Sequence, residues 1–67
     1  MKISARNQLK AKVKSVKLGS IMAEVELDVA GQTIVSVITK ESAESLHLAK
    51  GDDVTAIIKS TEVMVGK

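Results

Sequence analysis

Residues 21–29 read IMAEVELDV, with an apolar residue at every odd position. Successive side chains of a β-strand point to opposite faces, so this period of two predicts a strand with one buried face. In a helix the same apolar side chains would be spread around the whole circumference. We therefore expect the chain to be built on antiparallel strands that are half buried.

The alternation continues on both sides of this strand. Over about residues 8–17, apolar residues alternate with lysines, and residues 19–20, Gly-Ser, form the predicted turn. Gly31 with Gln32 marks the next turn, before a third strand over residues 33–39. Short polar turns of this kind connect sequential antiparallel neighbours, so the three strands are predicted to pair in chain order.

The third strand is apolar on both faces. Val35 and Val37 lie on one face of the predicted strand, while Ile34 and Ile38 lie on the other. A small antiparallel sheet has only one face toward its own core. We therefore expect the second apolar face to meet another subunit.

One stretch is helical, over residues 39–48. Thr39 or Ser42 is the predicted N-cap, and Ala43 with Leu46 marks the predicted buried side. A helix N-terminus can also bind an anion, although capping is the commoner role of such hydroxyls.

Two more strands complete the predicted fold. A turn at residues 50–52 leads to a fourth strand over 54–59 and a short fifth over 63–65. The fold class is then mostly all-β, a five-stranded Greek-key barrel of the OB-fold type with one short helix between strands three and four. A small open sandwich is the alternative. With 67 residues, the chain 1–67 is predicted to form a single domain.

The composition excludes several classes of protein. There is no cysteine and a single histidine, His47, so neither a zinc site nor a nucleophilic triad can be assembled. We expect no enzyme, no cofactor and no site for a bare metal cation. No apolar run reaches the roughly 20 residues of a membrane span, and no leader pattern opens the chain. A cytoplasmic location without membrane contact is therefore expected.

The composition also predicts an oligomer. Aromatic residues make up 0 % of the chain, although they usually supply the largest buried areas. A chain of this size buries only about 60 % of its unfolded surface, and disulfides are absent. We expect a homo-oligomer that completes its core with neighbouring subunits.

Charge is distributed unevenly along the chain. Residues 1–17 hold six basic residues and no acid, whereas residues 18–67 hold four basic and eight acidic ones. Arg6 is the only arginine, and its rigid fork of donors suits anions with several oxygens. A surface salt bridge is the ordinary alternative for such a residue. The run from Lys59 to Thr61 offers an amine and two hydroxyls where the strand pattern breaks, although it is also typical of a turn.

An OB-fold that binds single-stranded nucleic acid is the alternative function. Such modules stack bases on aromatic side chains, which this chain lacks, and its net charge is only +2. A purely structural oligomerisation domain is a third possibility, in which Arg6 would matter only for assembly.

Three separated motifs resemble one family. They are SARNQLK at residues 4–10, ITKESA at 38–43 and KSTEVM at 59–64, and together they resemble the molbindin (Mop) family. The resemblance implies a single Mop domain of the OB-fold type that binds molybdate or tungstate in the cytoplasm, for storage and homeostasis. It also implies a homo-hexamer, a trimer of dimers, with oxyanions held between subunits. One departure is Ala11, where the family often has glycine.

The resemblance further implies the binding residues. One subunit would contribute Ser4, the backbone of Ala5 and Arg6, while its partner would contribute Thr39, Ser42, Lys59 and Ser60. The turn of Gly19, Ser20 and Ile21 is the candidate for a second oxyanion site. The chemistry agrees, because molybdate at neutral pH is a fully deprotonated dianion whose oxygens only accept hydrogen bonds. Its pocket should hold donors and no carboxylate.

Overall fold

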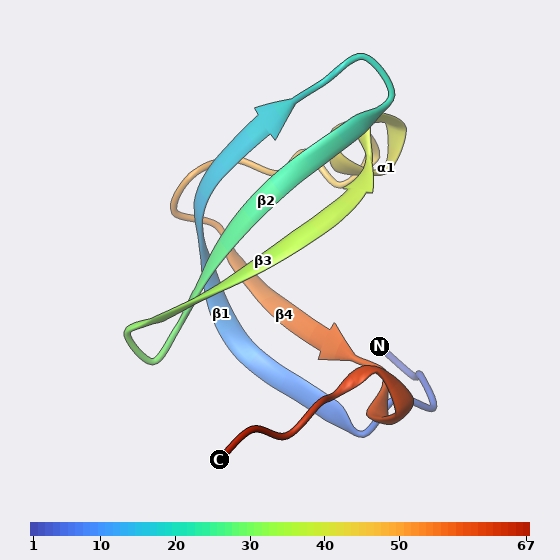
Figure 1. Cartoon of the computed structure of the whole chain (residues 1–67). Coiled ribbons are helices and arrows are strands. Elements are labelled where there is room, and N and C mark those ends of the chain that lie inside the picture. Colours follow the sequence, from blue (N-terminus) through green and yellow to red (C-terminus); the bar gives the residue numbers. More distant parts are fainter.

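The computed structural model describes all residues from 1 to 67 and contains one antiparallel sheet. Its four strands stand in the order β3-β2-β1-β4, and a short helix follows β3 (Figure 1). The prediction of a mostly β chain with one helix between the third and fourth strands is confirmed. The elements are β1 (Asn7–Leu18), β2 (Met22–Val29), β3 (Gln32–Thr39), α1 (Lys40–Ser45), β4 (Asp53–Ile58) and the 3₁₀ helix η1 (Ser60–Glu62).

Strand β1 is long and has different partners along its two halves. Residues 7–12 pair with β4, and residues 12–18 pair with β2. The register slips between Val13 and Ser15, and such a bulge bends a strand and increases its twist. Strand β4 is thereby carried away from β3, as Figure 1 shows.

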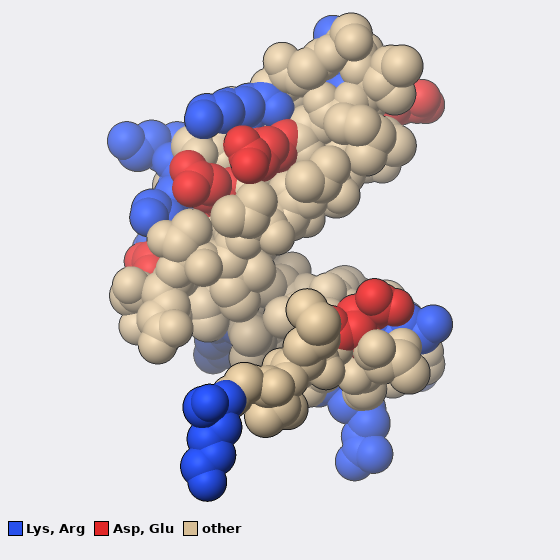
Figure 2. Space-filling view, in the orientation of Figure 1, with Lys and Arg blue, Asp and Glu red and all other residues tan.

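The sheet therefore forms an open half-barrel. A mostly apolar cleft of about 170 Å³ lies between β3 and β4, lined from β3 by Ser36 and Ile38 and from β4 by Val54 and Thr55. Figure 2 shows the surface hollowed between an upper and a lower lobe. The outer edges of β3 and β4 have no strand beside them within the chain.

The turn between β2 and β3 lies one residue earlier than predicted. It is made by Ala30 and Gly31, whose φ angles are 51° and 85°, while Gln32 already pairs with Val29. Two successive positive φ angles are the requirement of a type I′ hairpin, which matches the twist of the strands. The Asp28 carboxylate accepts a hydrogen bond of 2.9 Å from the Gly31 amide and supports the turn.

The core of the chain is small. Seven of the 67 residues are buried, all of them apolar, and the largest is Leu27. Ile34 and Ile38 on the inner face of β3 pack against this core. Val35 and Val37 on the outer face are 52 % and 62 % exposed. The prediction that β3 is apolar on both faces is confirmed, and one of those faces is open in the single chain.

The helix is shorter than predicted, and one of its two expected core residues is exposed. Thr39 is the N-cap and Ala43 is buried, as expected. The prediction for Leu46 is wrong, because its side chain is 65 % exposed. Helix α1 ends at Ser45, and a left-handed φ of 51° at His47 redirects the chain. Leu48 instead packs against the core. No helix in the structure has the length and apolar character to span a membrane.

The predicted fifth strand over residues 63–65 is absent from the single chain. Val63, Met64 and Val65 are 50 %, 93 % and 95 % exposed and pair with no strand. These three consecutive apolar residues follow the 3₁₀ helix η1, and a single unpaired segment of this length has no ladder hydrogen bonds to hold it as a strand (Figure 1). Four strands are therefore present, and the five-stranded closed barrel is not.

Candidate functional site

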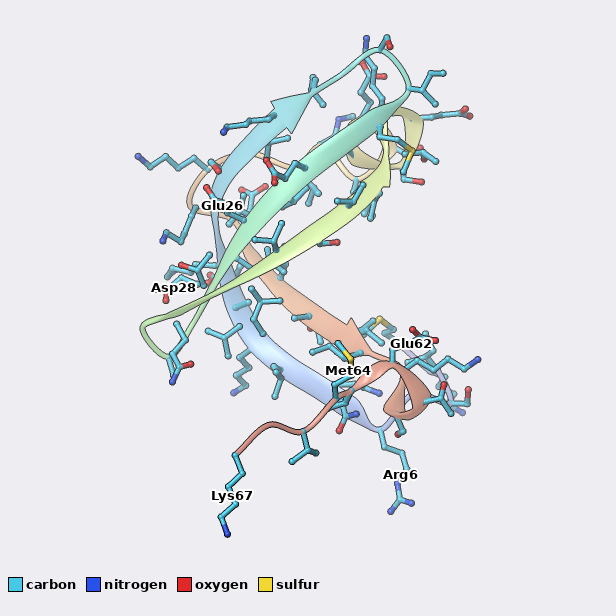
Figure 3. All side chains as sticks on the ribbon, in the orientation of Figure 1. Arg6, Glu26, Asp28, Glu62, Met64 and Lys67 are labelled. Carbon is cyan, nitrogen blue, oxygen red and sulfur yellow. The ribbon has the colours of Figure 1, made fainter.

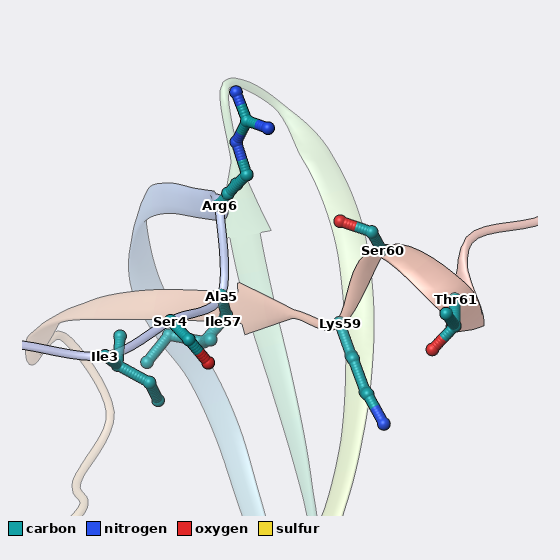
Figure 4. A pocket seen from close by; sticks show the side chains of 8 residues that line it. All are labelled: Ile3, Ser4, Ala5, Arg6, Ile57, Lys59, Ser60 and Thr61. Carbon is teal, nitrogen blue, oxygen red and sulfur yellow. The ribbon is translucent and has the colours of Figure 1, made fainter.

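A cavity of about 450 Å³ lies where the N-terminal arm meets the end of β4. Its polar lining comes from two segments that are more than fifty residues apart in the sequence (Figure 4). Two isoleucines supply the apolar part of the wall. The lining residues are Ile3, Ser4, Ala5, Arg6, Ile57, Lys59, Ser60 and Thr61.

Pairing of β1 with β4 brings the two segments together. Asn7 at the start of β1 is in register with Ile58 at the end of β4. The side-chain amide of Asn7 donates a hydrogen bond of 3.1 Å to the backbone carbonyl of Ile58. The residues just before Asn7 and just after Ile58 must then be neighbours. The side-chain amide of Gln8 donates a hydrogen bond of 2.7 Å to the backbone carbonyl of Ala5 and so ties the N-terminal arm to β1.

The lining offers hydrogen-bond donors without internal partners. The side chains of Ser4, Arg6, Lys59 and Ser60 make no hydrogen bond or ion pair within the chain, and no carboxylate lines the cavity. A buried anion needs donors and positive charge, and a nearby carboxylate would repel it. Figure 4 shows the Arg6 guanidinium and the Lys59 ammonium pointing in opposite directions. In this arrangement the two cations of one chain do not converge on a single point.

Carboxylates are concentrated elsewhere, on the outer face of the sheet. Lys12 and Asp53 form an ion pair of 2.8 Å, and the Ser15 hydroxyl donates 2.9 Å to Glu26. The hydrogen bond to Asp53, and then the negative charge of that carboxylate, raise the pKa of the Lys12 ammonium. Figure 2 shows acidic and basic side chains interleaved on the upper lobe, where Figure 3 labels Glu26. Asp53 lies at the start of β4 and Glu26 in β2, and neither lines the cavity.

Thr39 and Ser42 lie at the other end of the molecule from this cavity. Thr39 and the second candidate site line a separate cavity, beside the α1 end of the sheet in Figure 1. The Thr39 hydroxyl accepts from the Ser42 amide at 3.1 Å and donates to the Ser42 hydroxyl at 2.7 Å. The only proton of the Thr39 hydroxyl is thus used, whereas that of Ser42 is free.

The structure groups the candidate residues differently from the resemblance. Lys59 and Ser60 were expected to face Ser4 and Arg6 from a partner subunit, but they line one cavity with them in a single chain. Thr39 and Ser42 remain separate, so only another copy of the chain can bring them to that cavity.

The second candidate site has mixed charge. Ser20 and Ile21 line a cavity of about 460 Å³ with Lys40, Glu41 and Glu44, in addition to Thr39. Its two carboxylates distinguish it from the donor-only first cavity. Gly19 serves the turn itself, since a Cβ at this position would lie 2.8 Å from the Met22 carbonyl oxygen.

Thr61 is the lining residue to which the sequence reasoning gave no binding role. It follows Ser60 directly in the same polar run, so adjacency to two assigned residues was the available signal. No group of three or more histidine, cysteine or acidic side chains is placed to hold a metal ion.

Comparisons with known proteins agree on one group. The family model of the TOBE domain matches residues 3–65. Molybdenum-pterin-binding protein 3 of Clostridium pasteurianum is 52 % identical over 66 residues, which cover 97 % of this chain and of that protein. The structure of a molybdate-binding protein from Sporomusa ovata superposes with a TM-score of 0.95 at 46 % identity, covering all of both chains. The cytoplasmic molybdate-binding protein ModG, solved with molybdate bound, gives a TM-score of 0.84 at 46 % identity over 90 % of this chain and 43 % of that one.

Proposed function

Because the chain belongs to the molbindin (Mop) family of TOBE domains, we propose that it binds molybdate or tungstate in the cytoplasm and stores it without performing a reaction. The observation that carries this proposal is the cavity in which Ser4, Arg6, Lys59 and Ser60 offer free donors and no carboxylate takes part. Relatives of similar length are named for molybdenum or molybdate, which supports the choice of ligand.

The donor set matches the protonation state of the ligand. Molybdate and tungstate are dianions at neutral pH, and every oxygen accepts hydrogen bonds. Arg6 and Lys59 bring two positive charges to the wall of the cavity, and the hydroxyls supply neutral donors. Phosphate keeps a proton near neutral pH, and no carboxylate lines the cavity to accept a hydrogen bond from it. Sulfate has the same charge and shape, so rejection of sulfate must come from the size of a rigid cage.

We further propose that the site is completed between subunits. An oxyanion of five atoms fills only a few times the roughly 30 Å³ of one water molecule, far less than the cavity of about 450 Å³. Thr39 and Ser42 of a neighbouring copy would close the cavity, with the free hydroxyl proton of Ser42 as a donor. One subunit then contributes Ser4, Ala5, Arg6, Lys59 and Ser60.

A homo-hexamer, a trimer of dimers, is the proposed assembly. The small core, the open edges of β3 and β4 and the exposed Val35 and Val37 all favour coverage by other copies. In that assembly residues 63–65 would add the fifth strand and complete an OB-type barrel. This accounts for an apolar segment that has no partner in the single chain.

The turn of Gly19, Ser20 and Ile21 remains the proposed second oxyanion site. Lys40 beside it would supply the positive charge. Glu41 and Glu44 line the same cavity, so we expect this site to bind an oxyanion less tightly than the first.

Native mass spectrometry tests the function directly. The purified protein is measured alone and with molybdate, tungstate, sulfate or phosphate, and a short oligothymidylate serves as the nucleic-acid probe. We expect a hexamer that takes up several molybdate or tungstate ions and neither sulfate nor phosphate. Retention of the oligonucleotide, or equal indifference to all four anions, would refute the proposed function.

A further inference from the structure

Thr61 lines the proposed oxyanion cavity and has no assigned role. Its hydroxyl makes no hydrogen bond within the chain, like the hydroxyls of Ser4 and Ser60 in the same cavity. Other hydroxyls of the protein have internal partners, for example Ser15 with Glu26 and Thr33 with Lys14. Ser20, Ser36, Ser45 and Thr55 also lack an internal partner, so it is the place of the Thr61 hydroxyl in the cavity that distinguishes it.

Thr61 adds a neutral donor to the proposed donor set. Thr39 was expected to donate to the anion, but its hydroxyl proton goes to the Ser42 oxygen at 2.7 Å. A hydroxyl has a single proton to donate. An enclosed dianion with four acceptor oxygens needs a full complement of donors, and each oxygen left without one costs binding free energy. Thr61 is the hydroxyl of the cavity that can supply such a donor beside Ser4 and Ser60.

The backbone positions Thr61 for this role. The backbone of Lys59 is extended. The backbone amide of Glu62 donates a hydrogen bond of 2.9 Å to the Lys59 carbonyl and closes the tight turn η1. Figure 4 shows the Thr61 hydroxyl pointing to the same side of the cavity as the Lys59 ammonium and the Ser4 hydroxyl. Threonine is branched at Cβ and loses little rotamer freedom on binding, so its hydroxyl is better preorganised than that of a serine.

We infer that Thr61 is a further binding residue, which donates a hydrogen bond to the oxyanion on the side of Lys59. This inference rests on the proposed function, because it assigns a donor to the same site. Thr61 then joins Ser4 and Ser60 as a neutral donor of the first cavity, and the cap pair of Thr39 and Ser42 contributes through Ser42.

The test is calorimetric titration of molybdate into wild type, Thr61→Val and Thr61→Ser. Valine keeps the shape of the side chain and removes the hydroxyl, whereas serine keeps the hydroxyl. We expect Thr61→Val to bind about tenfold more weakly or worse, the loss typical of one hydrogen bond to a charged group. Thr61→Ser should stay within a few-fold of wild type. Thr55→Val removes an exposed threonine hydroxyl outside this cavity and serves as the matched control.

The outcomes separate this inference from the proposed function. If wild type does not bind molybdate, the proposed function fails and the inference fails with it. If wild type binds and Thr61→Val binds equally well, the inference alone is overturned. Equal weakening by valine and serine would also overturn it, because the hydroxyl would then not be the cause. Melting curves and native masses of all variants should match wild type, since Thr61 is exposed.

Discussion

Replacement of Arg6 by alanine should abolish tight oxyanion binding and leave the fold intact. The guanidinium is exposed and has no partner within the chain, so all its donors are available to a ligand. A bidentate contact comprises two hydrogen bonds to a charged group, each contributing about 1.5 kcal/mol or more once a neighbouring subunit excludes water. The loss of both is about 3 kcal/mol, or roughly a hundredfold in Kd.

The assay is titration calorimetry with molybdate at fixed salt, combined with native mass spectrometry. Arg6→Lys should fall between wild type and Arg6→Ala, because lysine keeps the charge but loses the fork geometry. Lys50→Ala removes one positive charge from an exposed turn outside the cavity and controls for net charge. The variants should keep the assembly and melting temperature of wild type. Molybdate binding by Arg6→Ala within threefold of wild type would refute the reasoning from the cavity.

Three further predictions concern stability and pH. Leu27→Ala should lower the free energy of unfolding by about 3 kcal/mol, because it removes most of the largest buried side chain from a small core. Urea denaturation measures this loss, and a change below about 1 kcal/mol would contradict the described packing of Leu27. Thr39→Ala should cost about 1 kcal/mol by removing the N-cap of α1, measured the same way, while Thr39→Ser should recover most of it. Asp53 raises the pKa of Lys12, so the stabilisation from this ion pair is fully present at neutral pH and is lost only as pH rises through the raised pKa. The difference in melting temperature between wild type and Lys12→Met should therefore stay constant up to about pH 9, and a difference that disappears between neutral pH and that value would count against the pair.

Local patterns predicted most of the secondary structure. The alternation over residues 21–29 and the β-branched run over 33–39 appear as β2 and β3, because the face on which a side chain lies depends only on its position along the strand. The errors occur where a segment depends on distant partners. Residues 63–65 have the apolar side chains of a strand but pair with no strand in the single chain. Leu46 has the spacing of a buried helix residue, yet the helix ends before it.

The residue types of the candidate site were predicted from the sequence, and their distribution between subunits stays a prediction. Ser4 and Arg6 attract attention because no acid lies in residues 1–17, and Lys59 and Ser60 because they offer an amine and a hydroxyl where the strand pattern breaks. Their meeting in one cavity depends on β4 pairing with the first half of β1, which no local pattern specifies. Thr61 was noted in the sequence as one of two hydroxyls in the run 59–61 but was given no binding role, because adjacent residues of a turn can point to either side and only coordinates show which.

The sequence by itself determined the period of each strand, the turn positions to within a residue, the absence of aromatic stacking and the donor character of the two polar segments. These are properties of composition and of neighbouring residues. Only the tertiary structure decided that Asn7 lies in register with Ile58, and hence that residues 4–6 and 59–61 form one cavity. The physical reason is that this register is set by burial of small core residues of β1 and β4, Ala11 and Ala56, against the rest of the sheet. Such packing acts between segments more than forty residues apart and leaves no local trace in the sequence.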